Sequence, residues 1–189
     1  KSKKKIIILK KKYLIIKYSK KKINYYSKKE NFIIGFFGEM IDKNNEVAKL
    51  ENIGSKLLKF NYQDTNKIKN FLSNYYGSFS FFYINLVKKI SFIANDRFGL
   101  NHIFYSIQKK NKYHLIVSDH LDMIKNNLKK NFLLNKNFAS QYILCRYDDI
   151  YGKNDTIYKD IFFLKASNVK IFNLLNFKNK QQRYWNFQK

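Results

Sequence analysis

The chain has 189 residues, 45% of them hydrophobic, and a net charge of +25. This length allows one domain with a sizeable core, and this hydrophobic fraction is typical of globular proteins and excludes global disorder. No apolar run approaches the roughly 18 residues that a membrane-spanning helix needs. The single cysteine, Cys145, excludes an internal disulfide and a multi-cysteine zinc site, and it fits a reducing, cytoplasmic compartment.

The positive charge is carried almost entirely by lysine. The arginines are only Arg97, Arg146 and Arg183, whereas base reading and phosphate recognition favour arginine. Lysine is accompanied by abundant Asn, Ile, Phe and Tyr and by no proline, a set of residues that an AT-rich genome favours through its codons. We therefore interpret the charge as compositional drift and predict no specific nucleic-acid partner, with non-specific anion binding left open as a side effect.

The N-terminal part of the chain predicts strands. Residues 5–9, 13–18 and 22–27 indicate short strands separated by lysine clusters. Residues 31–40 indicate a buried strand that ends at Gly38.

Two helices are expected next. Residues 46–60 place apolar side chains at helical intervals. A second helix is predicted to begin with Asp64 or Thr65 as its N-cap and to close at Gly77 as a C-terminal glycine.

Four strands follow in quick succession, at residues 78–84, 89–94, 103–107 and 113–117. Short links between consecutive strands predict antiparallel pairing rather than strand–helix–strand units. Between the second and third strands lies the turn of Asn95 to Ser106, where Gly99 supplies backbone freedom and Asp96 and Arg97 are expected to bond locally.

The last third of the chain mixes helices with short extended pieces. One helix is predicted to start with Ser118 or Asp119 as its cap, and another to cover residues 137–146. Extended pieces are expected at residues 156–158, 169–172 and 183–185. Strands, then helices, then strands indicate an α+β layered domain, with no repeat and no linker.

The order of motifs resembles the glutaminase domain of glutamine-dependent asparagine synthetases. The segment from Tyr76 to Ser106 resembles the central part of that domain, with its Asp-Arg-x-Gly turn between two strands. "GFFGEMID" and "YQDTNKI" resemble an upstream strand end and helix start, and "YHLIVSDHLDMIKNNL" and "DTIYKDIFFLKASNVKIF" resemble later segments. "RYW" resembles the closing tripeptide and favours this family over other class II amidotransferases. The six motifs cover residues 32–187 in the family's order.

The resemblance implies an N-terminal-nucleophile hydrolase fold, an αββα sandwich with two mostly antiparallel sheets. Residues 1–189 would form a single glutaminase-like domain, with a synthetase domain expected downstream as its partner in cis. ATP and Mg are implied only for that synthetase domain, and no cofactor and no metal are expected in this one. Glutamine is an implied ligand, and a homodimer is left open.

Three residues match positions that hold glutamine in the family. Gly38 would let the backbone approach the ligand closely, and Glu39 and Asp64 would hold its α-ammonium group. A turn glycine and a helix N-cap are the ordinary structural alternatives for Gly38 and Asp64.

The catalytic groups of the family have no counterpart in this sequence. The family uses an N-terminal cysteine as nucleophile and an asparagine as oxyanion donor, but the position that matches the asparagine is Phe37. The chain shows no cysteine near its start and only about half of the family's residues before Gly38. Cys145 is expected to pack as a small apolar residue. The three histidines, His102, His114 and His120, are expected to be structural, so no catalytic residue is predicted.

Three functions follow from these observations. The first is a glutaminase-like domain that does not hydrolyse glutamine and serves as a scaffold for a synthetase domain, a pseudoenzyme within the asparagine synthase (glutamine-hydrolysing) ligases. The second is an active amidotransferase domain whose cysteine lies upstream of Lys1. The third, motivated only by charge, is a basic nucleic-acid-binding module, which predicts lysines concentrated on one face.

Overall fold

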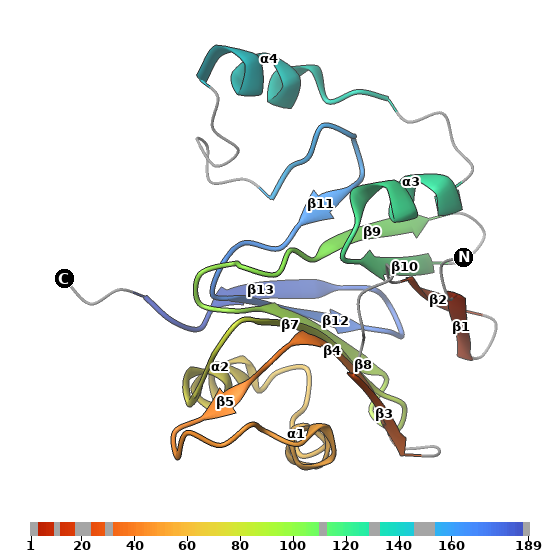
Figure 1. The fold of residues 1–189 in the computed structure, drawn as a ribbon. Coiled ribbons are helices and arrows are strands. Elements are labelled where there is room, and N and C mark those ends of the chain that lie inside the picture. The colour runs from red at the N-terminus through yellow and green to blue at the C-terminus, as the bar shows by residue number, and fades with distance from the viewer. Residues whose placement is uncertain are drawn as a thin grey trace. The chain divides into compact units, whose positions relative to one another are not determined.

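The computed structural model describes residues 4–9, 12–17, 24–28, 32–109, 113–128, 133–145 and 154–186. The chain groups into two compact units (Figure 1). The first unit contains residues 1–20 and 104–163, and the second contains residues 21–103 and 164–189.

The second unit is built on a six-stranded sheet in which every pairing is antiparallel. The strand order is β13 (Asn179–Arg183), β12 (Asn168–Asn173), β8 (Ile90–Asn95), β7 (Phe79–Asn85), β4 (Phe32–Gly38) and β3 (Asn24–Lys28). A separate two-residue pair joins β5 (Ile41–Asp42) to β6 (Tyr75–Tyr76).

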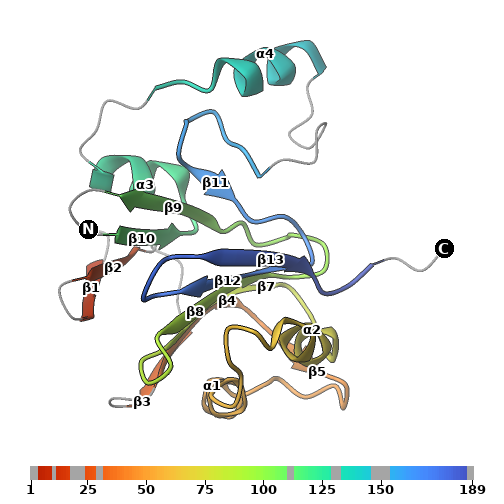
Figure 2. The ribbon, with the colours of Figure 1, turned by 180° about the vertical axis from the view of Figure 1, so that it is seen from behind.

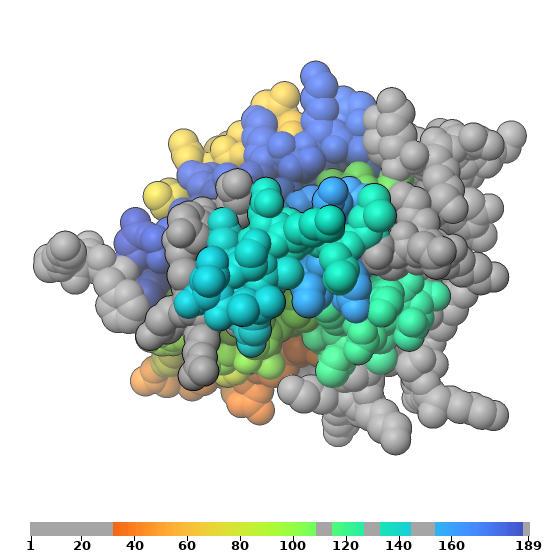
Figure 3. All heavy atoms as spheres, turned by 90° about the horizontal axis from the view of Figure 1, so that it is seen from above, coloured from red at the N-terminus to blue at the C-terminus, as the bar shows by residue number. Residues whose placement is uncertain are grey.

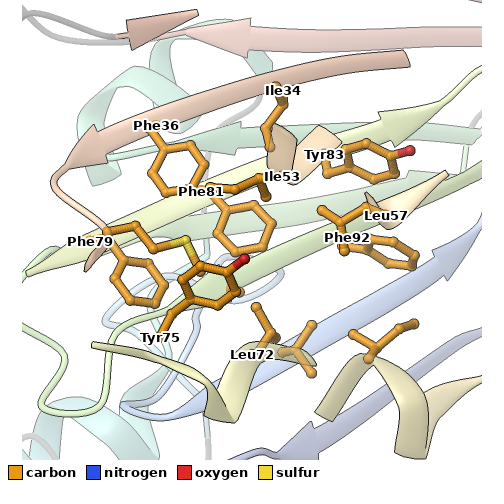
Figure 4. Close-up of a cluster of buried hydrophobic side chains, with 14 of the residues drawn as sticks. Ile34, Phe36, Ile53, Leu57, Leu72, Tyr75, Phe79, Phe81, Tyr83 and Phe92 are labelled. Atoms are coloured by element: carbon orange, nitrogen blue, oxygen red, sulfur yellow. The ribbon is translucent and has the colours of Figure 1, made fainter. Parts of the chain in front are cut away.

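Two helices, α1 (Leu50–Leu57) and α2 (Thr65–Ser73), lie on one face of this sheet (Figures 1 and 2). The core lies between the helices and the sheet, because alternate residues of β4, β7 and β8 point toward Ile53 and Leu57 of α1 and Leu72 of α2 (Figure 4). Aromatic rings fill much of this space, with the rings of Phe36 and Phe81 stacked at 5.1 Å. Strand alternation and helical spacing therefore supply one shared apolar layer.

Helix α1 contacts the sheet at its glycine. A Cβ atom on Gly54 would lie 1.9 Å from Cε2 of Phe32, whose side chain is fully buried. The absence of a side chain at Gly54 therefore sets how closely α1 can approach β4.

The first unit contains a five-stranded sheet. The strand order is β1 (Lys4–Leu9), β2 (Lys12–Lys17), β10 (Tyr113–Ser118), β9 (Phe104–Lys109) and β11 (Phe162–Phe163). The pairing of β2 with β10 is parallel, and the other three pairings are antiparallel. Helix α3 (Leu121–Leu128) packs on this unit through Ile124, which is buried with Ile116 and Ile161.

Helix α4 (Lys136–Cys145) carries apolar side chains at the surface (Figure 3). The side chains of Ile143 and Leu144 are 75% and 80% exposed, and the ring of Phe138 stacks on that of Tyr142 at 6.2 Å. The apolar side chains of this helix do not form a single buried face, and the helix contributes little to the core of its unit.

The predicted strands between residues 5 and 117 and at residues 169–172 are confirmed, and one pairing inferred from them is wrong. Strands β7 and β8 form a hairpin, and β9 pairs with β10, as short links predict. Strands β8 and β9, however, belong to different sheets, because the segment of residues 96–103 carries the chain from one sheet to the other. Strand β9 extends to Lys109, two residues beyond the strand predicted at residues 103–107, and residues 110–112 lie outside the described part of the chain.

The role predicted for Gly77 is also wrong. Helix α2 ends at Ser73 with Asn74 as its C-cap, and Gly77 follows β6 instead. Its φ of +109° serves a turn between β6 and β7. Helix α1 is shorter than the predicted residues 46–60. Of residues 156–158, only Tyr158 forms an isolated bridge, and of residues 183–185, only Arg183 belongs to a strand, at the end of β13.

The α+β class with two mostly antiparallel sheets is confirmed. The sandwich arrangement of the layers stays a prediction. Among the helices of the described residues, none is long and apolar enough to cross a membrane.

We expect Gly54→Ala to destabilise the protein by about 1–3 kcal/mol, because the added methyl group overpacks the contact with Phe32. In an exposed helix the same change would stabilise by about 0.4–1 kcal/mol, so the sign of the effect is diagnostic. Urea unfolding of wild type and variant measures it. A more stable variant would show that α1 does not contact β4 at Gly54.

Candidate functional site

The candidate site begins where β4 ends. Gly38 has a φ of +79°, and a Cβ atom there would lie 1.9 Å from the carbonyl oxygen of Ser78. The backbone N–H of Glu39 donates to this same oxygen over 2.9 Å. Gly77 makes a second close approach, because its Cβ position lies 2.5 Å from the carbonyl oxygen of Glu39. These two glycines let the two chain segments lie against each other, which no other residue type allows without strain.

Asn101 closes the same region from the turn after β8. Its side-chain amide donates to the hydroxyl oxygen of Ser78 over 2.6 Å and lies 2.9 Å from the Cβ position of Gly38. We call Gly38, Glu39, Ser78 and Asn101 the strand-end cradle. Sequence reasoning missed Ser78 and Asn101, because nothing local signals a contact between positions 23 residues apart.

The cradle is held in place by Asp96. This side chain is fully buried, and its carboxylate accepts hydrogen bonds from the backbone N–H groups of Phe98 at 2.8 Å and of Leu100 and Asn101 at 3.2 Å. The prediction that Asp96 bonds locally is therefore confirmed. Each of these bonds satisfies a buried charge that would otherwise be costly.

Phe37 occupies the position that resembles the oxyanion asparagine. Its side chain is 4% exposed, and its backbone pairs with Ser80 of β7. Because residues alternate along β4, Phe37 lies on the face opposite to that of Phe36, which packs in the core under α1 and α2. A buried phenyl ring supplies no hydrogen-bond donor to a ligand beside Gly38.

The three residues predicted to hold glutamine do not all lie together. Gly38 and Glu39 are adjacent, and both are exposed at the end of β4. Asp64 starts α2, whose first turn contacts β13, since the Gln182 side chain donates to that of Asn66 over 3.2 Å. Strands β7, β8 and β12 separate β13 from β4, which places these two strands about 19 Å apart at about 4.8 Å per strand.

The partners of Asp64 are local. One carboxylate oxygen accepts the backbone N–H of Asn61 over 2.7 Å, and the other lies 3.4 Å from the ammonium of Lys67. The Asn61 hydrogen bond is the main reason that the pKa of Asp64 is lowered, with Lys67 and Lys88 adding to it. Asp64 occupies the N-cap position as predicted, but its side chain makes no capping bond to the helix. The glutamine-binding role of the three residues stays a prediction.

The side chains that the structure describes show no site built from cysteine and histidine. Cys145 ends α4 rather than lying within it, and the side chains of Cys145 and His114 lie outside the described residues. His102 is exposed just before β9, and His120 is exposed just before α3. Within the described ranges, no three His, Cys, Asp or Glu side chains come close enough to hold a metal ion.

The closing "RYW" tripeptide is tied to the Asp-Arg turn. The hydroxyl of Tyr184 donates to the carbonyl oxygen of Asn95 over 2.7 Å, and burial raises the pKa of that hydroxyl. The guanidinium of Arg97 lies 5.3 Å from the ring centre of Trp185 and donates to the carbonyl oxygen of Ser73 over 3.0 Å. The prediction that Arg97 bonds locally is therefore wrong, because its partners come from the end of α2 and from the segment after β13.

Neither a protein-family model nor a curated protein matches the chain. Two solved structures are similar at 12% sequence identity. One is an allosteric regulatory enzyme of purine biosynthesis, with a TM-score of 0.42 over 86% of this chain and 30% of that chain. The other is glutamine phosphoribosylpyrophosphate amidotransferase from B. subtilis complexed with ADP and GMP, with a TM-score of 0.40 over 88% of this chain and 32% of that chain. The chain thus spans less than a third of the length of either structure.

Tyr184 and Tyr83 form a matched pair for testing the tie between the closing tripeptide and the turn. Both side chains are buried in the same core, but the hydroxyl of Tyr83 has no hydrogen-bond partner. We expect Tyr184→Phe to cost about 1–2 kcal/mol, because it leaves the carbonyl of Asn95 unpaired. Tyr83→Phe removes a buried hydroxyl that has no acceptor, so it should leave stability unchanged or raise it. Chemical unfolding compares them, and equal effects would contradict the tie.

The lowered pKa of Asp64 predicts a pH-dependent contribution to stability. The contribution is present above the ordinary pKa of 3.8 and is lost as the pH falls through the lowered folded-state value. We expect Asp64→Asn to lower the urea midpoint at pH 6 and to match wild type near pH 2. Glu46→Gln removes the same charge from an exposed loop and serves as the control. A deficit that persists unchanged at pH 2 would contradict this account.

Proposed function

We propose that this chain is a glutaminase-like domain of an asparagine-synthetase-like, ATP-dependent amidotransferase. In this proposal it does not hydrolyse glutamine itself and acts as a scaffold for a synthetase domain in the same protein. The ordered motifs from Gly35 to Trp185 support the family assignment. The observation that carries the loss of hydrolysis is the buried ring of Phe37 beside Gly38.

The chemical argument concerns the oxyanion. Attack on the side-chain amide of glutamine moves negative charge onto its carbonyl oxygen in the transition state, and donors placed at that oxygen lower the barrier. Removing one such donor costs about a hundred- to a thousandfold in rate in acyl-transfer enzymes. The side chain of Phe37 has no hydrogen-bond donor, and the ring is buried against the sheet. It therefore cannot replace the donor of an asparagine at this position.

The cradle retains features suited to an amino acid. The left-handed backbone at Gly38 permits a ligand to approach the main chain closely. The neighbouring residue Glu39 is exposed, whereas Asp96 is buried. We therefore propose that glutamine binds here without being hydrolysed, with its ammonium group on Glu39. ATP and Mg would be used by the synthetase domain, and the whole protein would work in the cytoplasm.

We expect the full-length protein to release no ammonia from glutamine above the buffer rate, because the transition-state charge lacks its donor. A coupled glutamate dehydrogenase assay measures ammonia directly. Steady release with multiple turnovers would overturn this proposal and favour the alternative of an active amidotransferase whose cysteine lies upstream of Lys1.

Glutamine binding is a separate test of the cradle. We expect Glu39→Gln to weaken glutamine binding about tenfold or more in a calorimetric titration, because a charged hydrogen bond contributes about 1.5–3 kcal/mol. Glu46→Gln, which removes an exposed carboxylate from the segment after β5, is the matched control and should leave binding unchanged. Asp64→Asn decides whether the third predicted residue takes part. Equal affinities for the Glu39 and Glu46 variants would show that Glu39 does not hold the ligand.

A further inference from the structure

Lysines gather around the segment that joins α1 to α2. We define the loop patch as Lys56, Lys59, Lys67, Lys88 and Lys180 together with Tyr62. All five lysines are exposed, and they come from α1, from the segment after it, from α2, from the turn between β7 and β8, and from β13. The acidic residue among them is Asp64, which pairs with Lys67. The patch therefore keeps a strong positive charge even after this pairing.

Lys88 is fixed over the end of α1. Its ammonium group donates to the carbonyl oxygens of Lys59 at 2.9 Å and Phe60 at 3.3 Å. These carbonyls lie just beyond the C-terminal end of the helix, where a cation is favourable. An ammonium has three donors, so one donor of Lys88 is left for a further acceptor.

Lys180 is fixed over an aromatic ring. Its ammonium lies 4.9 Å from the ring centre of Tyr62, in a cation–π contact. The ring of Tyr62 is partly exposed and packs at its base against the core. An aromatic ring thus lies beside the ammonium group of Lys180, two residues along the chain from the Phe60 carbonyl that Lys88 contacts.

A lysine whose ammonium group is already held in place loses less conformational entropy on binding than a freely rotating lysine. Ordering a long side chain on association costs about 0.5–1.5 kcal/mol, and this cost is already met where the protein holds the group in place. Compositional drift can place lysine at many surface positions, but drift does not predict that one ammonium group is bonded to the carbonyls of Lys59 and Phe60 while another lies over the ring of nearby Tyr62. This arrangement is the reason to treat the loop patch as a binding surface.

We propose that the loop patch binds single-stranded nucleic acid without sequence preference. The lysines would contact phosphates, and a base would stack on the exposed part of the Tyr62 ring that Lys180 does not cover, the combination typical of surfaces that bind single strands. Lysine rather than arginine supplies point charges without base reading, so no sequence specificity is expected. This activity is independent of the strand-end cradle, which lies at the opposite end of β7 from Lys88.

The test is fluorescence anisotropy with a labelled 15-residue oligouridine at several KCl concentrations. The patch variant is Lys59→Gln/Lys67→Gln/Lys180→Gln, which leaves Lys88 on the end of α1. The matched control is Lys43→Gln/Lys49→Gln/Lys159→Gln, which removes the same charge from exposed positions outside the patch. We expect the patch variant to bind about tenfold or more weakly and its salt slope to fall by about 2, at about 0.7 per lost contact. Equal losses in both variants would show that net charge alone drives binding and would overturn the proposal.

Tyr62→Leu separates nucleic acid from other polyanions, because it keeps an apolar side chain against the core but removes the ring. Loss of a stacked base should weaken oligouridine binding about fivefold or more, since stacking contributes about 1–3 kcal/mol per base. Heparin, which has no bases, should lose less affinity than oligouridine, because it loses only the fixed position of Lys180 and no stacked base. If oligouridine affinity is unchanged, or if both ligands lose affinity equally, the assignment to nucleic acid is wrong.

Discussion

The buried carboxylate of Asp96 is the constraint on which much of the second unit depends. Three backbone N–H groups converge on this side chain, while its backbone N–H donates to Phe79 and its carbonyl accepts from Ser167. A buried charge is tolerated only when such bonds replace its water. The requirement to satisfy it forces the chain to turn sharply after β8, and this turn delivers Asn101 to Ser78 and leads the chain out of the sheet.

The same turn connects distant parts of the sequence. Arg97 reaches the end of α2, and Trp185 and Tyr184 close over the turn from the segment after β13. The Asp-Arg turn and the closing "RYW" tripeptide are thus structural neighbours in the second unit. The residues that resemble a glutaminase domain here make structural contacts. In the proposed function, whether glutamine is hydrolysed depends on the residues beside Gly38.

In the proposed function, the side chain at position 37 is what separates binding of an amino acid at this point from its hydrolysis. The backbone at Gly38 and the carboxylate of Glu39 suit recognition of an amino acid, because recognition needs only charge and close approach. Hydrolysis needs in addition a donor for charge that develops in the transition state. Phe37 is buried as a part of the sheet, so the position contributes to packing instead. Elsewhere on the surface, tertiary contacts fix the positions of two charged groups: Lys88 bonds the carbonyl of Lys59, and Lys180 lies over the ring of Tyr62.

The sequence by itself determined the strands, the approximate starts of the helices and the turn at Asp96, since alternation, helical spacing and Asp-x-x-Gly chemistry act between residues close in the chain. It also led to Gly38 and Glu39 through a resemblance. Only the tertiary structure decided that β8 and β9 join different sheets, that β2 pairs in parallel with β10, and that Asp64 lies near β13 rather than near Gly38. It alone placed Asn101 on Ser78 and Lys180 on Tyr62. These contacts join residues far apart in the chain, and their energy depends on how whole layers pack, which no local pattern encodes.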